Sequence, residues 1–103
     1  MVTNGMRPVH PGDILREEYL APLRMSASRL AIKLHLPVTR IRKILNEERA
    51  ITPDAALRLA RYFGGDAQTW LNLQVAYELK KAVAEHGDEI EKDVRPREND
   101  EAA

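Results

Sequence analysis

The chain of 103 residues contains no cysteine, and only 5% of its residues are aromatic. Without cysteine it has neither a disulfide framework nor thiolate zinc sites. Scarce aromatics predict a core built mainly from Leu, Ile, Val and Ala. No apolar run approaches the roughly 20 residues of a membrane-spanning helix, and residues 1–7 lack the apolar centre of a signal peptide. We therefore expect one small cytoplasmic domain with no membrane partner, for which Met6 is an alternative start.

The chain also lacks net charge, with 16 basic and 16 acidic residues, but these charges are unevenly distributed. From Arg24 to Arg49 there are seven basic and two acidic residues, a local charge of +5. From Glu85 to Ala103 eight acids and three bases give −5. Binding to phosphate requires a local basic patch rather than a basic whole chain. Overall neutrality therefore does not exclude a nucleic-acid partner.

Capping residues, prolines and glycines predict five helices and no strand, and thus an all-α fold. The expected helix starts are His10-Pro11-Gly12-Asp13, Ser26, Pro37, Thr52-Pro53-Asp54 and Asp66. The expected ends are the residue before Pro22, the turn His35-Leu36-Pro37, Asn46 and Gly64-Gly65. The fifth helix is the longest.

Composition divides the chain into three parts. Residues 1–9 are expected to form a flexible lead, and residues 10–90 a helical domain that includes the long C-terminal helix. Residues 91–103 are rich in charge and poor in apolar side chains, so they cannot bury enough surface to offset the entropy of ordering. We expect them to form a disordered acidic tail.

The third expected helix, from about Pro37 to Asn46, has two different faces. Val38, Ile41, Ile44 and Leu45 recur at helical spacing on one side. The polar positions carry mainly basic and hydroxyl side chains. A short helix precedes it across a tight turn, and this arrangement is typical of a helix-turn-helix, whose second helix enters the major groove of DNA.

Position along this helix predicts which side chains meet which part of the duplex. Residues near its start reach base edges, and Arg is suited to gripping guanine with two hydrogen bonds. The expected base-reading residues are Val38, Thr39, Arg40 and Lys43. The expected phosphate contacts are Ser26, Arg42, Asn46 and Arg49. Two alternatives stay open: Val38 belongs to the core, and the basic residues form an ordinary solvated face.

The fifth expected helix carries two apolar stripes. One contains Trp70, Leu73 and Tyr77, which is enough to dock the helix on its own domain. The other consists of Leu71, Val75, Leu79 and Val83. A second stripe predicts a surface for dimerisation or for another partner.

Several stretches of the chain resemble the XRE-like (lambda-repressor-like) helix-turn-helix family, and more narrowly the HigA-type (VapI-like) antitoxins. They are HPGDILREE (10–18), RLA (29–31), IRKILN (41–46), ITPDAALRLA (51–60), and FG (63–64) followed by WLNLQ (70–74). The chain departs from the family's usual residues at His35, where Gly is usual, at Thr69, where an aromatic is usual, and at Glu47-Glu48, where Gly-Lys is common.

The resemblance implies a homodimer that binds a palindromic operator in double-stranded DNA and represses its own operon. It also implies a partner, a small HigB-type ribonuclease toxin that the chain neutralises. No cofactor or metal is expected.

Other readings carry different expectations. A stand-alone helix-turn-helix repressor would have no toxin partner, and a protein-interaction module would not bind a duplex. An enzyme is disfavoured because His10, His35 and His86 lack metal-site spacing. Glu17 and Glu18, as neighbours on a helix, do not face each other as a catalytic pair would.

Overall fold

The computed structural model describes residues 7–99, so residues 1–6 of the expected lead and 100–103 of the expected tail lie outside the described residues. The first helix comprises α1 (Pro11–Ile14), a π-helical stretch (Leu15–Leu20) and α2 (Ala21–Leu23). The others are α3 (Ala27–Leu34), α4 (Val38–Leu45), α5 (Pro53–Phe63) and α6 (Ala67–Asp93), followed by a 3₁₀ turn (Arg97–Asn99). The prediction of five successive helices, the last one longest and with no strand over residues 7–99, is confirmed.

The first helix runs through Pro22, so the prediction that it ends before this proline is wrong. Ala21 keeps helical geometry (φ −61°, ψ −49°), and its N–H donates to the carbonyl of Arg16, five residues back. The wider π-helical turn that precedes Pro22 accommodates a residue without an N–H. The helix ends instead at Arg24, which is left-handed at φ 52°.

The predicted N-caps Ser26, Thr52 and Asp66 are confirmed. The side chain of each accepts a hydrogen bond from the backbone N–H three residues later, at 3.1, 3.2 and 2.9 Å respectively. Such a cap typically contributes about 1 kcal/mol. At the other end of α5, Gly64 adopts φ 92°, as its predicted role as a helix stop requires.

Two turns around α4 place non-glycine residues in left-handed backbone. His35, in the turn before α4, has φ 57°, and Glu47, just after α4, has φ 65°. These are two of the positions at which the family resemblance implies glycine. Left-handed geometry costs an L-residue about 1–2 kcal/mol, so packing elsewhere holds α4 between two strained turns.

The core lies between the first helix, α3, α4 and α5, and the start of α6 covers it. The predicted apolar faces of α3 (Leu30, Ala31, Leu34) and α4 (Ile41, Ile44, Leu45) are buried. Tyr19 of the first helix packs on Phe63 and Trp70, with ring centroids 4.9 and 5.2 Å apart. Aliphatic side chains thus dominate the core, with Trp70 as its aromatic contribution from α6.

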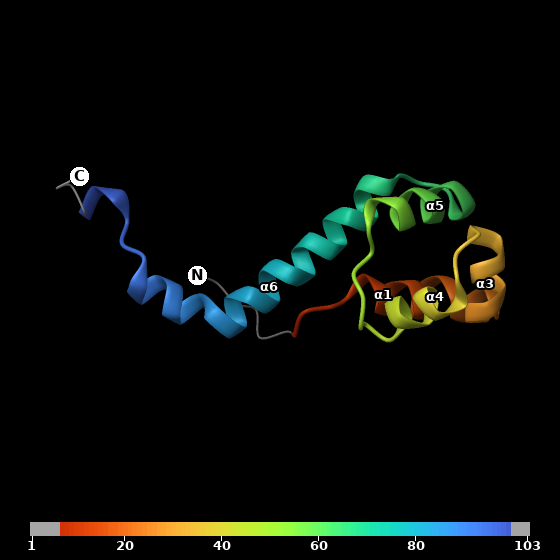
Figure 1. Ribbon diagram of the computed structural model, residues 1–103, viewed down its shortest axis with the longest axis horizontal. Coiled ribbons are helices and arrows are strands. Elements are labelled where there is room, and N and C mark those ends of the chain that lie inside the picture. The colour runs from red at the N-terminus through yellow and green to blue at the C-terminus, as the bar shows by residue number, and fades with distance from the viewer. Residues whose placement is uncertain (1–6, 100–103) are drawn as a thin grey trace.

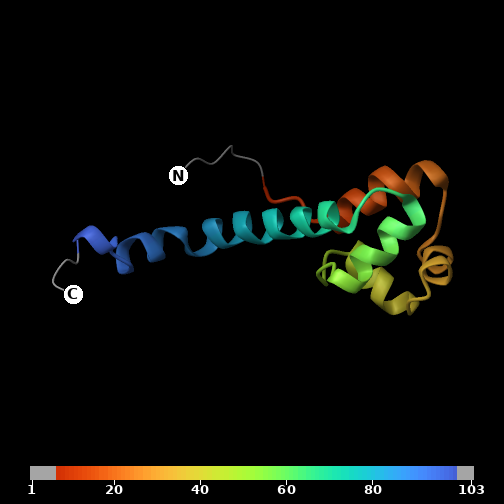
Figure 2. The same ribbon diagram turned by 90° about the horizontal axis from the view of Figure 1, so that it is seen from above.

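Helix α6 leaves this bundle and projects away from it (Figures 1 and 2). The molecule is correspondingly elongated, with principal extents of 58, 27 and 23 Å. The helix continues to Asp93, three residues past the expected domain boundary at residue 90. Over residues 7–99, no helix combines the length and apolar character needed to cross a membrane.

Helix α1 packs against the last turn of α4 by direct backbone contact at Gly12. A Cβ atom added to Gly12 would lie 1.9 Å from the carbonyl oxygen of Ile44. No side chain fits in that space, so only glycine lets the two helices approach this closely. Gly87, within α6, is different, because its added Cβ would come no closer than 3.4 Å, to Val83 Cγ1.

These two glycines form a matched pair for substitution. Gly12→Ala should lower the free energy of unfolding by about 3 kcal/mol, because the backbone of α4 cannot yield without moving the helix. Gly87→Ala should raise it by about 0.5–1 kcal/mol, because alanine favours an open helical position. Urea denaturation followed by circular dichroism measures both. Equal tolerance of the two substitutions would contradict the close contact.

Candidate nucleic-acid interface

Helix α4 presents a continuous polar front to solvent. At about 100° per residue, its exposed residues share one side, opposite the buried Ile41, Ile44 and Leu45. We call these exposed residues the α4 front: Thr39, Arg42, Lys43 and Asn46. The arrangement matches what a groove-reading helix requires, namely apolar support behind and hydrogen-bonding side chains ahead.

Two of the predicted base-reading residues, Val38 and Arg40, flank this front on opposite sides. Val38 is half-buried and packs against the core, so it has the core contact that the sequence left open, while part of its surface stays exposed. Arg40 is also half-buried, on the side that faces α5. The structure therefore brings Thr39 and Lys43 directly onto the front and places Val38 and Arg40 at its edges.

The side chain of Arg40 lies against the start of α5. Its Nη2 donates to Oγ1 of Thr52 at 2.8 Å, the same oxygen that caps α5 by accepting from Ala55 N at 3.2 Å. Its Nε is buried and has no hydrogen-bond partner among the described residues. The predicted guanine reader thus rests on its own protein in this structure.

The predicted phosphate-contacting residues lie on the front, as Arg42 and Asn46 do, or beside it, as Ser26 and Arg49 do. Ser26 is exposed at the N-terminus of α3, and Arg42 extends toward that helix, where its Nη2 lies 3.4 Å from Ser28 Oγ. Ser26 Oγ accepts a bond from the backbone, which leaves its proton able to donate to a phosphate. Asn46 and Arg49 are exposed beyond the other end of α4. A bound duplex could therefore meet both ends of α4.

Arg16 fixes the C-terminal end of α4 from the first helix. Its guanidinium donates to the carbonyl of Leu45 and pairs with Asp13. It also lies 3.1 Å from Glu17 and 3.8 Å from Glu47. A cation at this end of a helix is favourable because the last carbonyls there lack partners within the helix.

Arg58 of α5 holds the end of α3 in a similar way. Its Nη1 donates to the carbonyls of Leu34 and His35 at 2.8 and 3.3 Å, and its Nε pairs with Asp54 at 2.8 Å. Because His35 occupies the turn between α3 and α4, this contact fixes the angle at which α4 leaves the turn.

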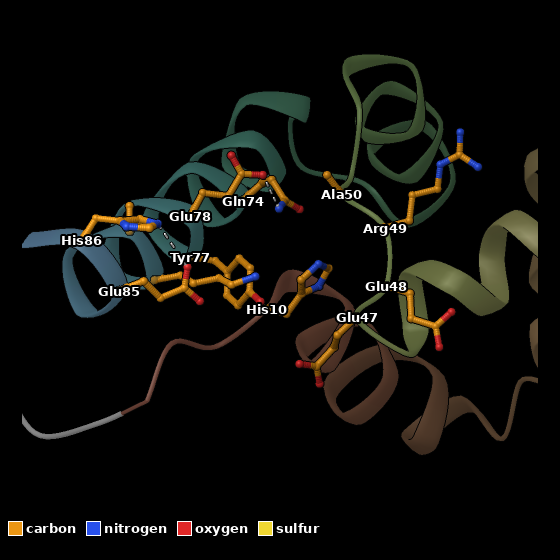
Figure 3. Close-up of a pocket in the computed structure, with 12 residues that line it drawn as sticks. His10, Glu47, Glu48, Arg49, Ala50, Gln74, Tyr77, Glu78, Glu85 and His86 are labelled. Carbon is orange, nitrogen blue, oxygen red and sulfur yellow. Dashed lines mark hydrogen bonds and ion pairs between the residues drawn. The ribbon is translucent and has the colours of Figure 1, made fainter.

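A cleft of about 370 Å³ separates α6 from the loop that follows α4 (Figure 3). Gln74 spans from α6 to that loop, where its Oε1 accepts from Ile51 N at 2.8 Å and its Nε2 donates to Glu78 at 2.9 Å. Arg49, on the same loop, points away from α6 in Figure 3. The loop is therefore anchored to α6 while Arg49 stays exposed.

At the same cleft, His10 caps α1. Its Nδ1 accepts from Gly12 N at 2.8 Å, and its ring packs edge-on against Tyr77, with centroids 4.8 Å apart. Burial lowers the pKa of His10 below its ordinary value, although Glu47 and Glu78 act to raise it. The neutral imidazole that results is the form that can accept the hydrogen bond from Gly12.

The residues that hold α4 in place could not be predicted from local sequence patterns. They are His10, Gly12, Arg16, Arg58 and Gln74. All five lie in the stretches that carry the family resemblance, which was the available signal, but no local pattern shows which distant backbone atom each one contacts. Across the described residues, no group of three or more His, Cys, Asp or Glu side chains could hold a metal ion.

Comparison with known proteins identifies the family. A profile described as helix-turn-helix matches residues 15–70, more than half of the chain. The chain belongs to this helix-turn-helix family. Virulence-associated protein I of Dichelobacter nodosus is 61% identical over 79 residues, which are 77% of this chain and 73% of that protein.

Two solved structures place the resemblance more narrowly. An addiction module antidote protein of the HigA family from Coxiella burnetii has 52% identity and a TM-score of 0.84, over 88% of this chain and 99% of that one. Pseudomonas aeruginosa antitoxin HigA, solved with the higBA promoter, has 43% identity and a TM-score of 0.85, over 87% and 98%. The XRE-like fold and the resemblance to HigA-type antitoxins are confirmed. These proteins are DNA-binding regulators and antitoxins, which also confirms the expectation that the chain is not an enzyme.

Proposed function

We propose that the chain is a dimeric, sequence-specific DNA-binding antitoxin that represses its own operon from a palindromic operator in the cytoplasm. The observation that carries this proposal is the α4 front, a row of exposed polar and basic side chains on a helix whose other side is buried. The solved HigA of P. aeruginosa with its promoter supports it, since that chain shares this fold over nearly its whole length.

Within the interface, we assign base reading to the start and centre of α4. Thr39 and Lys43 lie on the front and can donate to base edges, and Val38 offers apolar contact to a thymine methyl group. Arg40 is assigned the bidentate contact to guanine, which requires its side chain to leave Thr52. Arg42 and Asn46 of the front, together with Ser26 and Arg49 beside it, contact phosphates and set the register.

We assign the dimer interface to the second apolar stripe of α6, called here the outer stripe, which consists of Leu71, Val75, Leu79 and Val83. Leu71 packs partly against the core and Val83 is half-buried, whereas the side chains of Val75 and Leu79 are 62% and 65% exposed. Ile90 continues the same stripe and is also exposed. The 16 residues after Tyr77 extend about 24 Å, and an isolated helix of that length is only marginally stable in water. Burial against a second copy would stabilise it.

The toxin is assigned as a small HigB-type ribonuclease. Relatives named as antitoxins support this partner. A ribonuclease must attract RNA and therefore presents a basic surface, which the acidic far end of α6 complements in charge. The second candidate function is that of a stand-alone repressor without a toxin, because the α4 front by itself supports DNA binding and requires no toxin.

Substitutions in the interface should separate base reading from phosphate binding. Lys43→Ala should reduce the preference for the duplex enriched from a random-sequence library over a scrambled duplex by about tenfold. Arg49→Ala should weaken binding to both duplexes equally and lower the salt slope by about one unit. Fluorescence anisotropy at several salt concentrations measures both effects. Lys92→Ala, at the far end of α6, is the control and should change neither. If only the Arg49 variant lost its sequence preference, the base-reading surface would lie elsewhere than on α4.

A charge on the outer stripe of α6 should disrupt the dimer. Leu79→Asp should give monomers in sedimentation velocity, because an unpaired carboxylate cannot be buried between two apolar helices. Ala84→Asp introduces the same charge on an exposed position off the stripe and should leave the dimer intact. Dimers that persist in the Leu79 variant would place the interface on another surface.

The toxin assignment is tested by co-expression with the adjacent small open reading frame. Expressed alone, that frame should arrest growth. Expressed together with this chain, it should be harmless and should co-purify as a complex. A harmless neighbour that forms no complex would refute the antitoxin assignment and favour the stand-alone repressor.

A further inference from the structure

The resting position of Arg40 links two parts of the proposed interface. Its guanidinium donates to Thr52 Oγ1 at 2.8 Å, so a side chain of α4 is attached to the N-cap of α5. Arg40 lies beside Lys43 on the helix surface, one turn before it, and its long side chain is able to swing from α5 to the front. The same residue can therefore satisfy either Thr52 or a base, but not both.

This resting position leaves the guanidinium incompletely satisfied. Of its five donors, Nε is buried without a partner in the described part of the chain, and a buried unpaired donor is costly. The bond to Thr52 joins a cation to a neutral hydroxyl, whereas the O6 and N7 atoms of guanine accept two hydrogen bonds from an arginine in the major groove. Arg40 therefore makes a more favourable contact with a guanine at the correct position than with Thr52, and a less favourable contact with any other base.

We infer that Thr52 is a specificity-determining residue that competes with DNA for Arg40. This inference rests on the proposed function. On a correct sequence Arg40 leaves Thr52 for guanine, and on an incorrect one it stays on Thr52. The free energy by which Arg40 favours the correct sequence is then the free energy of its contact with guanine minus that of its contact with Thr52. A stronger contact at position 52 must therefore reduce discrimination without any change in the groove-facing residues.

A pair of nearly isosteric variants isolates this competition. Thr52→Asn and Thr52→Asp both provide good N-caps for α5, but only the aspartate carries a negative charge and forms an ion pair with Arg40. The readout is the ratio of affinities for the duplex that wild-type protein enriches from a random-sequence library and for a scrambled duplex. Repulsion between the added carboxylate and DNA lowers both affinities alike and cancels in this ratio.

The expected ratio for Thr52→Asp is about fivefold lower than for Thr52→Asn, and this gap should vanish when both are combined with Arg40→Ala. Thermal melting of the four variants shows whether the aspartate binds Arg40. If it does, Thr52→Asp should melt at a higher temperature than Thr52→Asn, and this extra stability should disappear when Arg40 is replaced by alanine. Equal ratios despite that extra stability would overturn the inference, as would melting that shows no dependence on Arg40. Failure of wild-type protein to prefer any duplex would instead refute the proposed function, so the two failures are distinguishable.

Discussion

The backbone contact between Gly12 and Ile44 is the constraint on which the position of α4 depends. Since no Cβ separates the two helices there, α1 lies directly against the last turn of α4, and Arg16 from the same helix reaches the carbonyl of Leu45. His10 maintains the start of α1 by accepting from Gly12 N. A helix that must present side chains to a groove needs a fixed angle and depth, and this contact supplies both from outside the helix-turn-helix.

The same logic explains why α4 is held by its ends rather than along its front. The front must stay open to DNA, so the restraints act on the turns and the last carbonyls. Arg58 bonds the end of α3 and the turn at His35, and Gln74 bonds the loop after α4 at Ile51. These contacts offset the cost of left-handed backbone at His35 and Glu47. The backbone strain therefore lies in the turns before and after α4 and not within the helix itself.

Local patterns predicted the helices well because caps and apolar spacing act within one or two turns of the chain. Ser26, Thr52 and Asp66 cap the helices they were expected to cap, and the apolar face of α4 is buried. Two predictions depended on wider context. The end of the first helix was wrong because a π-helical stretch accommodates Pro22, and the resting place of Arg40 was missed because Thr52 is twelve residues away. Side-chain contacts between elements, such as that of Arg16 with Leu45, leave no periodic signal in a single sequence.

The spatial separation of charge explains how a neutral chain presents a basic interface. Seven basic residues lie between Arg24 and Arg49, on and around α4, whereas five acids lie close together on the last part of the projecting α6: Glu85, Asp88, Glu89, Glu91 and Asp93. The molecule is 58 Å long, several times the Debye length of about 8 Å at physiological salt, so the acids there scarcely weaken the field at the α4 front. The two charged regions therefore act independently of each other. The long final helix keeps them apart.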